Sequence, residues 1–278
     1  MTEASHPDWL EPVQRLAEQA GEQILAVYES ADFQVESKAD DTPLTRADRA
    51  AHEVIEAGLR DLAPRVPQLS EEGDEVAAAE RGAWGLYWLI DPLDGTREFI
   101  KRNGEFTVNI ALVEGGEPVL GVVHAPVLGT TWSACRGRGA WRVDGGEVEA
   151  IATRRAEPPL TAVVSRSHRE DAVADMLARL GEVEELSVGS SLKICRIAEG
   201  AADLYPRFGP TCEWDTGAAQ CVLEAAGGQL LDVGLTPLRY NTGESLLNPD
   251  FIAVGDPAFD WAAVTEGLAW EARRVAPC

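Results

Sequence analysis

Two carboxylates and a threonine follow directly on an apolar run at residues 86–90. The segment reads Asp91-Pro92-Leu93-Asp94-Gly95-Thr96. Proline restricts the backbone after the first aspartate, and glycine permits a tight reversal after the second. We expect both carboxylates and the Leu93 carbonyl to point to one side, with the Thr96 hydroxyl at its edge. Mg²⁺ binds such an all-oxygen set, whereas the ordinary alternative is an Asp-Gly hairpin turn whose carboxylates cap backbone amides.

Further acidic residues extend this pattern. Glu71 and Glu72 follow the strand-like run at residues 66–70, and Asp48 and Asp215 each open a predicted helix. Taken singly, an acid at a helix start is most simply a cap, because its carboxylate accepts hydrogen bonds from amides that lack a partner. Glu71-Glu72 alone is most simply a solvated loop. The spacing along the sequence leaves open whether these acids converge.

The composition is strongly acidic. The chain has 278 residues, of which 24 are lysine or arginine and 47 are aspartate or glutamate, so its formal charge is −23. Nucleic-acid polymers and anionic membranes attract basic surfaces, so this composition argues against a bulk binder of either kind. A phosphorylated small molecule must therefore be received by a local positive site or by metal ions. With 45% hydrophobic residues, the chain can bury one large core or two modest ones.

The cysteines and the apolar runs indicate the compartment. Cys135, Cys195, Cys212, Cys221 and Cys278 form no CxxC pair and no metal-finger spacing. No apolar run approaches the roughly 20 residues of a membrane span. Because no signal peptide is recognisable, we expect a cytoplasmic protein in a reducing compartment. Peripheral attachment to the inner face of the membrane stays open, as does the oligomeric state, with a monomer favoured.

Hydrophobic periodicity predicts two halves. In the first, helices are expected at residues 8–30 and 46–62, followed by strands at 86–90, 106–113, 119–125 and 130–135. After Pro158-Pro159 the pattern alternates, with strands at 160–165, 183–188, 202–205 and 229–233 and helices at 170–180, 191–199 and 215–226. Such alternation is typical of an α/β unit. We therefore predict an α+β half over residues 1–157, with most of the acidic positions, and an α/β half over residues 158–278.

Several stretches occur in an order that matches a known phosphatase family. They are Asp48, Ser70-Glu71-Glu72, residues 91–96, Trp214-Asp215-Thr216-Gly217-Ala218 and Ala226-Gly227-Gly228. As a set, and over nearly the whole chain, they resemble the lithium-sensitive, magnesium-dependent phosphatases of the inositol monophosphatase superfamily. Many relatives carry alanine where Gly217 stands, a departure that leaves Asp215 intact.

Other stretches resemble one branch of that superfamily, the CysQ-type 3′(2′),5′-bisphosphate nucleotidases. They are residues 101–109, Ser165-Arg166-Ser167-His168, Gly189-Ser190-Ser191-Leu192-Lys193 and residues 204–210. The resemblance implies hydrolysis of 3′-phosphoadenosine 5′-phosphate to AMP and phosphate, a step that serves sulfur assimilation. It also implies a layered αβαβα sandwich of the inositol monophosphatase and fructose-1,6-bisphosphatase type, with the site in the cleft between an α+β and an α/β half.

The resemblance assigns roles to the acids. Glu71, Asp91 and the Leu93 carbonyl would hold one Mg²⁺, and Asp91, Asp94 and Asp215 a second, with two or three ions per site. Glu72 is a weaker candidate, either for a third ion or for support of the other ligands. Glu71 with Thr96 would orient the attacking water, while Asp48 would polarise Thr96 or accept its proton. Two metal ions that clamp the attacking and leaving oxygens suit the slow hydrolysis of a phosphate monoester.

The resemblance also implies a set of substrate contacts: Gly95, Thr96, Ser165, His168, Gly189, Lys193 and Asp215. The backbone amides at residues 189–191 precede a predicted helix and are suited to an anion. Simpler interpretations stay open, namely Ser190-Ser191 as a helix cap, Lys193 as a solvated charge and His168 as a surface residue. Arg207 is either a surface charge or a phosphate contact.

Two other functions stay open. An inositol-1-monophosphatase would use the same metal site but would not need the stretches at residues 165–168 and 189–193. A non-catalytic acidic protein that binds divalent metal would be expected to lack at least one water-positioning group, whereas Asp48, Glu71 and Thr96 are all present. We therefore expect an enzyme with a small-molecule nucleotide as its partner.

Overall fold

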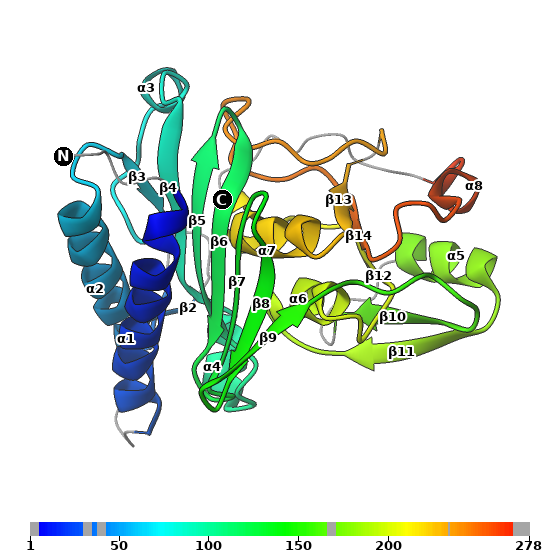
Figure 1. The fold of residues 1–278 in the computed structure, drawn as a ribbon, viewed down its shortest axis with the longest axis horizontal. Coiled ribbons are helices and arrows are strands. Elements are labelled where there is room, and N and C mark those ends of the chain that lie inside the picture. Colours follow the sequence, from blue (N-terminus) through cyan, green and yellow to red (C-terminus); the bar gives the residue numbers. More distant parts are fainter. Residues whose placement is uncertain (1–5, 30–34, 38–42, 166–170, 233, 269–278) are drawn as a thin grey trace.

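The computed structural model describes residues 6–29, 35–37, 43–165, 171–232 and 234–268. Two β-sheets are separated by a pair of helices, and further helices lie outside each sheet (Figure 1). The order of the layers is therefore helix, sheet, helix, sheet, helix, which confirms the predicted αβαβα sandwich.

Seven strands form the larger sheet, in the order β3-β4-β5-β6-β7-β8-β9. Their bounds are β3 Gln68–Ser70, β4 Leu86–Asp94, β5 Thr107–Glu114, β6 Glu117–Ala125, β7 Thr130–Cys135, β8 Gly139–Asp144 and β9 Glu147–Ile151. β3 pairs with β4 in parallel, and every later pair of neighbours is antiparallel, as the short turns predict. The sequence pattern does not predict the β8–β9 hairpin, because β8 is mostly half-buried, β9 is largely exposed and neither strand forms a long apolar run.

Two long helices cover the outer face of this sheet, α1 Leu10–Glu29 and α2 Arg46–Leu62 (Figure 1). Their apolar residues recur at helical spacing, so that Ile24 of α1 and Ile55 of α2 are fully buried in one cluster with Trp88 of β4. Burying a side chain of this size stabilises the fold by about 1.5–3 kcal/mol. The 3-10 helix His6–Trp9, the short helix α3 Ala78–Arg81 and the two-stranded sheet of β1 Val35–Ser37 and β2 Pro43–Thr45 complete this half.

Five strands form the smaller sheet, in the order β11-β10-β12-β14-β13. Their bounds are β10 Leu160–Val164, β11 Val183–Ser187, β12 Leu204–Arg207, β13 Gln229–Leu231 and β14 Phe251–Val254. β10 pairs in parallel with β11 and β12, whereas β14 pairs antiparallel with β12 and β13. Helices α5 Asp171–Leu180 and α8 Trp261–Thr265 pack on its outer side, where Met176 and Trp261 share a cluster with Ile252 of β14.

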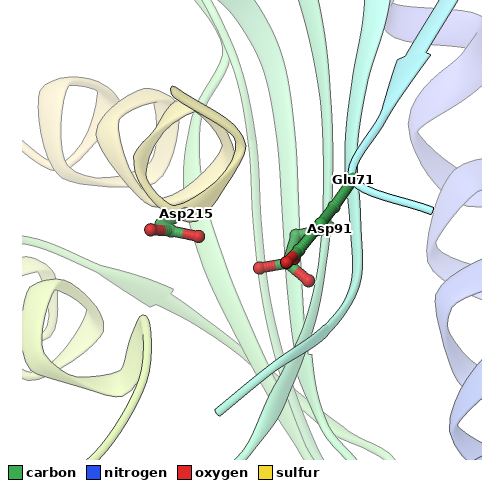
Figure 2. Close-up of side chains that lie close together, drawn as sticks. All are labelled: Glu71, Asp91 and Asp215. Carbon is green, nitrogen blue, oxygen red and sulfur yellow. The ribbon is translucent and has the colours of Figure 1, made fainter. Parts of the chain in front are cut away.

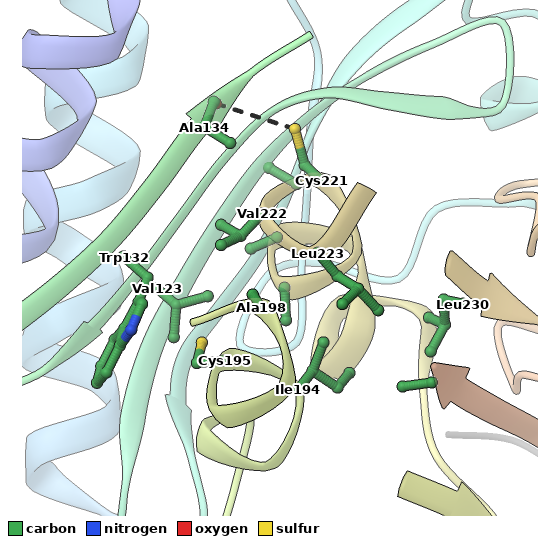
Figure 3. Packing of buried hydrophobic residues seen from close by; sticks show 14 of the residues in the cluster. Val123, Trp132, Ala134, Ile194, Cys195, Ala198, Cys221, Val222, Leu223 and Leu230 are labelled. Atoms are coloured by element: carbon green, nitrogen blue, oxygen red, sulfur yellow. Dashed lines mark hydrogen bonds between the residues drawn. The ribbon is translucent and has the colours of Figure 1, made fainter. Parts of the chain in front are cut away.

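Helices α6 Leu192–Ala198 and α7 Glu213–Ala225 form the middle layer. One hydrophobic cluster joins Trp132 of the larger sheet, Cys195 of α6, Val222 of α7 and Leu230 of the smaller sheet (Figure 3). The change of sheet falls between Ile151 and Leu160, and the division of the chain at residues 157 and 158 stays a prediction. None of the helices in the described part of the chain combines the length and the apolar character that a membrane span needs.

Candidate active site

The segment Asp91–Thr96 links strand β4 to the short helix α4 Thr96–Lys101. β4 continues past the predicted end at residue 90 as far as Asp94, with a register shift after Asp91 where Pro92 supplies no N–H to the ladder. Gly95 then adopts a left-handed conformation with φ 93° and leads into α4. The predicted tight reversal is therefore wrong, although the bend does require glycine.

Three carboxylates from distant parts of the sequence meet beside this segment (Figure 2). Glu71 follows β3, Asp91 lies on β4 and Asp215 lies in the first turn of α7; one oxygen of each is within 4.8 Å of the others. The backbone N–H of Glu71 donates to the Ile90 carbonyl at 3.1 Å, which holds Glu71 beside Asp91. The convergence that the sequence left open is thus observed for these three acids.

Asp215 also caps its own helix. Its Oδ2 accepts a hydrogen bond from the backbone N–H of Cys212 at 2.8 Å, the geometry of a capping box at the start of α7. The cap interpretation and the cluster interpretation therefore hold together at this residue. The cap hydrogen bond fixes the Asp215 side chain in a position where its carboxylate faces Glu71 and Asp91.

The cluster places negative charges together in a buried space. Burial raises the pKa of Asp91 well above its usual value, and four neighbouring carboxylates raise it further, those of Glu71, Asp94, Asp215 and Asp48. Burial and then the charges of Asp94 and Glu71 raise the pKa of Asp215 as well. A group of acids with this mutual repulsion is stabilised by a bound cation or by protons.

The donor set fits a hard divalent cation. Asp91 Oδ1 accepts a hydrogen bond from the Leu93 N–H at 3.0 Å, but its Oδ2 is buried and receives no donor from the described residues. Burying such an oxygen costs free energy unless a cation or a hydrogen-bond donor contacts it. The carboxylates of Glu71 and Asp215 supply further oxygen ligands at a range suited to Mg²⁺.

Asp94 stands outside the group of three. Its Oδ2 lies 2.9 Å from Ser191 Oγ, while its charge acts on both Asp91 and Asp215. Asp48 is 1% exposed in the first turn of α2, and its charge also acts on Asp91. Asp94, a predicted metal ligand, and Asp48, predicted to act on Thr96, thus both lie close enough for their charges to act on the cluster.

The predicted catalytic hydroxyl lies next to the predicted ligand carbonyl. Thr96 Oγ1 donates to the Leu93 carbonyl oxygen at 3.5 Å, which is long for a hydrogen bond, and Thr96 is buried. A Cβ on Gly95 would overlap Ser190 Oγ, so glycine at position 95 lets the two halves approach here.

A cleft opens beside the acids and is lined from both halves. Five predicted substrate or metal residues line it: Asp94, Ser165, Gly189, Lys193 and Asp215. His168 lies outside the described residues. The lining also includes residues that sequence reasoning missed, among them Arg97, Glu98, Thr211, Thr216 and Phe251. They lie on α4, on α7 and the segment before it, and on β14, so they share no spacing signal in the sequence.

The backbone at residues 189–191 differs from the predicted anion site. The Gly189 N–H donates to Glu105 Oε2 at 2.9 Å, so this amide is already used, and a Cβ at position 189 would lie 2.8 Å from the Glu105 carbonyl oxygen. The helix-cap interpretation of Ser191 is also wrong, because its side chain makes no cap hydrogen bond at α6. Glycine serves close packing here, and the serine hydroxyl turns toward Asp94.

Lys193 and Arg207 bring positive charge to the cleft. Lys193 is half-buried, with Nζ 5.5 Å from the centre of the Tyr205 ring. Burial lowers the pKa of Lys193, although nearby acids, Asp94 first among them, raise it. Arg207 donates to Thr211 Oγ1 at 3.0 Å and to the Pro210 carbonyl at 2.9 Å. The solvated-charge interpretation of Lys193 is therefore wrong, and Arg207 is a fixed cation at the cleft.

Comparison with known proteins gives a consistent result. The sequence profile of the inositol monophosphatase family matches residues 8–269. The 3′(2′),5′-bisphosphate nucleotidase CysQ of Escherichia coli K12 is 53% identical, over 87% of this chain and 98% of that protein. The CysQ nucleotidase of Haemophilus influenzae is 40% identical, over 92% of this chain and 96% of that protein. The solved structure of CysQ from Bacteroides thetaiotaomicron superposes with a TM-score of 0.78 and 44% identity, covering 88% of this chain and 96% of that one.

Proposed function

Because this chain belongs to the inositol monophosphatase family, we propose that it is a Mg²⁺-dependent 3′(2′),5′-bisphosphate nucleotidase. It converts 3′-phosphoadenosine 5′-phosphate to AMP and phosphate and serves sulfur assimilation in the cytoplasm. The observation that carries the proposal is the convergence of Glu71, Asp91 and Asp215 beside a cleft that also holds Lys193 and Arg207. The nucleotidases named above, at 53% and 40% identity, support the choice of substrate.

The metal ligands are proposed to be Glu71, Asp91 and Asp215, joined by Asp94 and the Leu93 carbonyl, for two or three Mg²⁺ ions. When bound, Mg²⁺ lowers the pKa of a coordinated water and withdraws charge from the phosphate oxygens. The buried Asp91 Oδ2, which no described residue satisfies, is the oxygen that most needs such a partner.

The chain's own groups orient the attacking water, and Asp48 acts on Thr96. The Glu71 carboxylate accepts one hydrogen bond from that water, and Thr96 Oγ1 accepts the other. The Thr96 proton, which here points to the Leu93 carbonyl at 3.5 Å, is redirected to the Asp48 carboxylate. The long distance of this hydrogen bond means that little is lost when the hydroxyl turns.

The cations of the cleft receive the phosphate that stays on the product. The protein carries a formal charge of −23, so a substrate with two phosphate groups needs local positive charge. Lys193, half-buried beside Tyr205, and Arg207, fixed by Thr211, line the cleft and supply that charge. Ser165 lines the same cleft and is proposed to contact the nucleoside.

The test is phosphate release with Mg²⁺ from 3′-phosphoadenosine 5′-phosphate and, in parallel, from inositol 1-phosphate. We expect a clear preference for the nucleotide and loss of activity on chelation with EDTA. Preference for inositol 1-phosphate would keep the metal site and overturn the assignment of the cleft residues. Release from neither substrate, by folded protein with Mg²⁺, would favour the non-catalytic metal-binding alternative.

A further inference from the structure

A single buried hydroxyl joins the two halves of the candidate metal site. Ser191 Oγ lies 2.9 Å from Asp94 Oδ2, 2.7 Å from the Asp215 carbonyl oxygen and 2.9 Å from Asn109 Nδ2. Ser191 is 3% exposed and Asn109 is 1% exposed. Asp94 lies on β4, Asn109 on β5 and Asp215 on α7, and Ser191 directly precedes α6.

The chemistry of these groups fixes the direction of the hydrogen bonds. An asparagine Nδ2 can only donate, so Ser191 Oγ accepts from Asn109. A hydroxyl has one proton, which leaves it to donate to the Asp94 carboxylate or to the Asp215 carbonyl. The bond to the carboxylate is charge-assisted and therefore the stronger of the two.

Asn109 occupies a special position in the larger sheet. It is the cross-strand partner of Asp91 in the β4–β5 ladder. Its Oδ1 is buried and receives no donor from the described residues. An apolar residue would avoid this unsatisfied oxygen, so the contribution of Asn109 to the site is its donation to Ser191.

We propose that Ser191 and Asn109 are positioning residues for the metal ligands. The hydroxyl accepts from Asn109 on β5 and donates to Asp94, and so holds the Asp94 carboxylate toward the site. The proposal rests on the Mg²⁺ site of the proposed function but not on the identity of the substrate. Loss of such outer hydrogen-bond partners typically weakens metal affinity 10–100-fold.

The experiment measures Mg²⁺ binding to the protein by calorimetry, without substrate, for Ser191→Ala, Asn109→Val and the double variant. We expect Ser191→Ala to weaken Mg²⁺ binding at least about tenfold. Because both residues act through one hydroxyl, the double variant should bind like Ser191→Ala alone. Asn109→Val should unfold at the same temperature as the wild type in EDTA, or higher, a result that a merely structural asparagine would not give.

The matched control is Ser133→Ala. Ser133 is fully buried on β7 and accepts a hydrogen bond from Gln14 Nε2 at 2.7 Å, the same amide-to-hydroxyl arrangement at a distance from the acids. Mg²⁺ binding by this variant should match the wild type. Wild-type affinity in Ser191→Ala, or fully additive effects in the double variant, would overturn the proposal.

The outcome separates this inference from the proposed function. A wild-type protein that binds Mg²⁺ but hydrolyses neither phosphate ester would overturn the nucleotidase proposal and leave the positioning role standing. If Ser191→Ala fails to fold, wild-type Mg²⁺ affinity in Asn109→Val overturns the proposal and weakened affinity supports it.

Discussion

Gly121 of β6 lies directly against the carbonyl oxygen of Ala218 in α7. A Cβ at position 121 would overlap that oxygen and stand 2.7 Å from Cys221 Cβ. The absence of a side chain therefore sets how closely α7 packs on the larger sheet. Because Asp215 lies in the first turn of α7 and Asp91 on β4, this spacing also sets the separation of two carboxylates of the site.

Replacing Gly121 with alanine should push α7 away from the sheet. The obstructing atoms are backbone, which cannot rotate aside, so we expect the free energy of unfolding to fall by about 1–3 kcal/mol and kcat/KM to fall with it. Urea unfolding and phosphate release measure the two effects. Gly85→Ala is the control, because a Cβ there meets no atom within 4 Å. Equal stability of the two variants would contradict this account of the packing.

Asp91→Asn should separate activity from stability. The variant loses a proposed ligand, so we expect phosphate release to fall by about 100-fold or more. It also removes one charge from a buried group of acids, so in EDTA its melting temperature should rise. Asp74→Asn makes the same change at an exposed acid and should alter neither quantity. A lower melting temperature for Asp91→Asn in EDTA would show that repulsion does not dominate at this position.

The stability of the metal-free protein should depend on pH in an unusual direction. The pKa values of Asp91 and Asp215 are raised in the folded state. The folded protein therefore holds these protons more tightly than the unfolded chain, and stability present at low pH is lost as the pH rises through the raised values. We expect this loss in EDTA and its reversal by Mg²⁺, measured as melting temperature against pH. Mg²⁺ binding should likewise strengthen as the pH rises, because it displaces protons.

His124 should make the free energy of unfolding depend on pH in the opposite direction. It lies under α1, where a Cβ on Gly21 would stand 2.7 Å from its Cδ2, and burial lowers its pKa from 6.5 to about 4. Between pH 6.5 and about 4, His124 is protonated in the unfolded chain but stays neutral in the folded protein. The free energy of unfolding therefore falls as the pH drops through this range. The shift corresponds to about 3 kcal/mol. His124→Gln should lack this component of the unfolding free energy between pH 7 and pH 4.5; an unchanged slope would contradict the assignment.

Local signals in the sequence predict the elements that periodicity governs. The helix expected at residues 46–62 and the strand expected at residues 130–135 have these bounds in the structure. β14 gives no such signal, because it is four residues long and follows an irregular segment. The strand at residues 86–90 extends to Asp94 because pairing with β5 resumes after Pro92, a long-range effect.

The chemistry of the site could be predicted by residue type, but its contacts could not. Ser191 has the local signature of a helix cap, yet its hydroxyl contacts Asp94, which is 97 positions away. The Gly189 amide is used by Glu105, 84 positions away. Asn109 is different, because a polar residue inside the apolar run predicted as a strand at residues 106–113 is expected to be buried and to need a hydrogen-bond partner.

The middle layer makes the two halves of the chain mutually dependent. A fragment that ended between Ile151 of β9 and Leu160 of β10 would keep Glu71 and Asp91 but would expose the face of the larger sheet that Val222 and its neighbours cover. The complementary fragment would keep Asp215 on α7, but the face of α7 that packs on the larger sheet would be exposed to solvent. Neither piece would be an enzyme, but each presents the surface that the other lacks. The fold is therefore suited to fragment complementation, in which two separately expressed pieces recover catalysis only by assembling with each other.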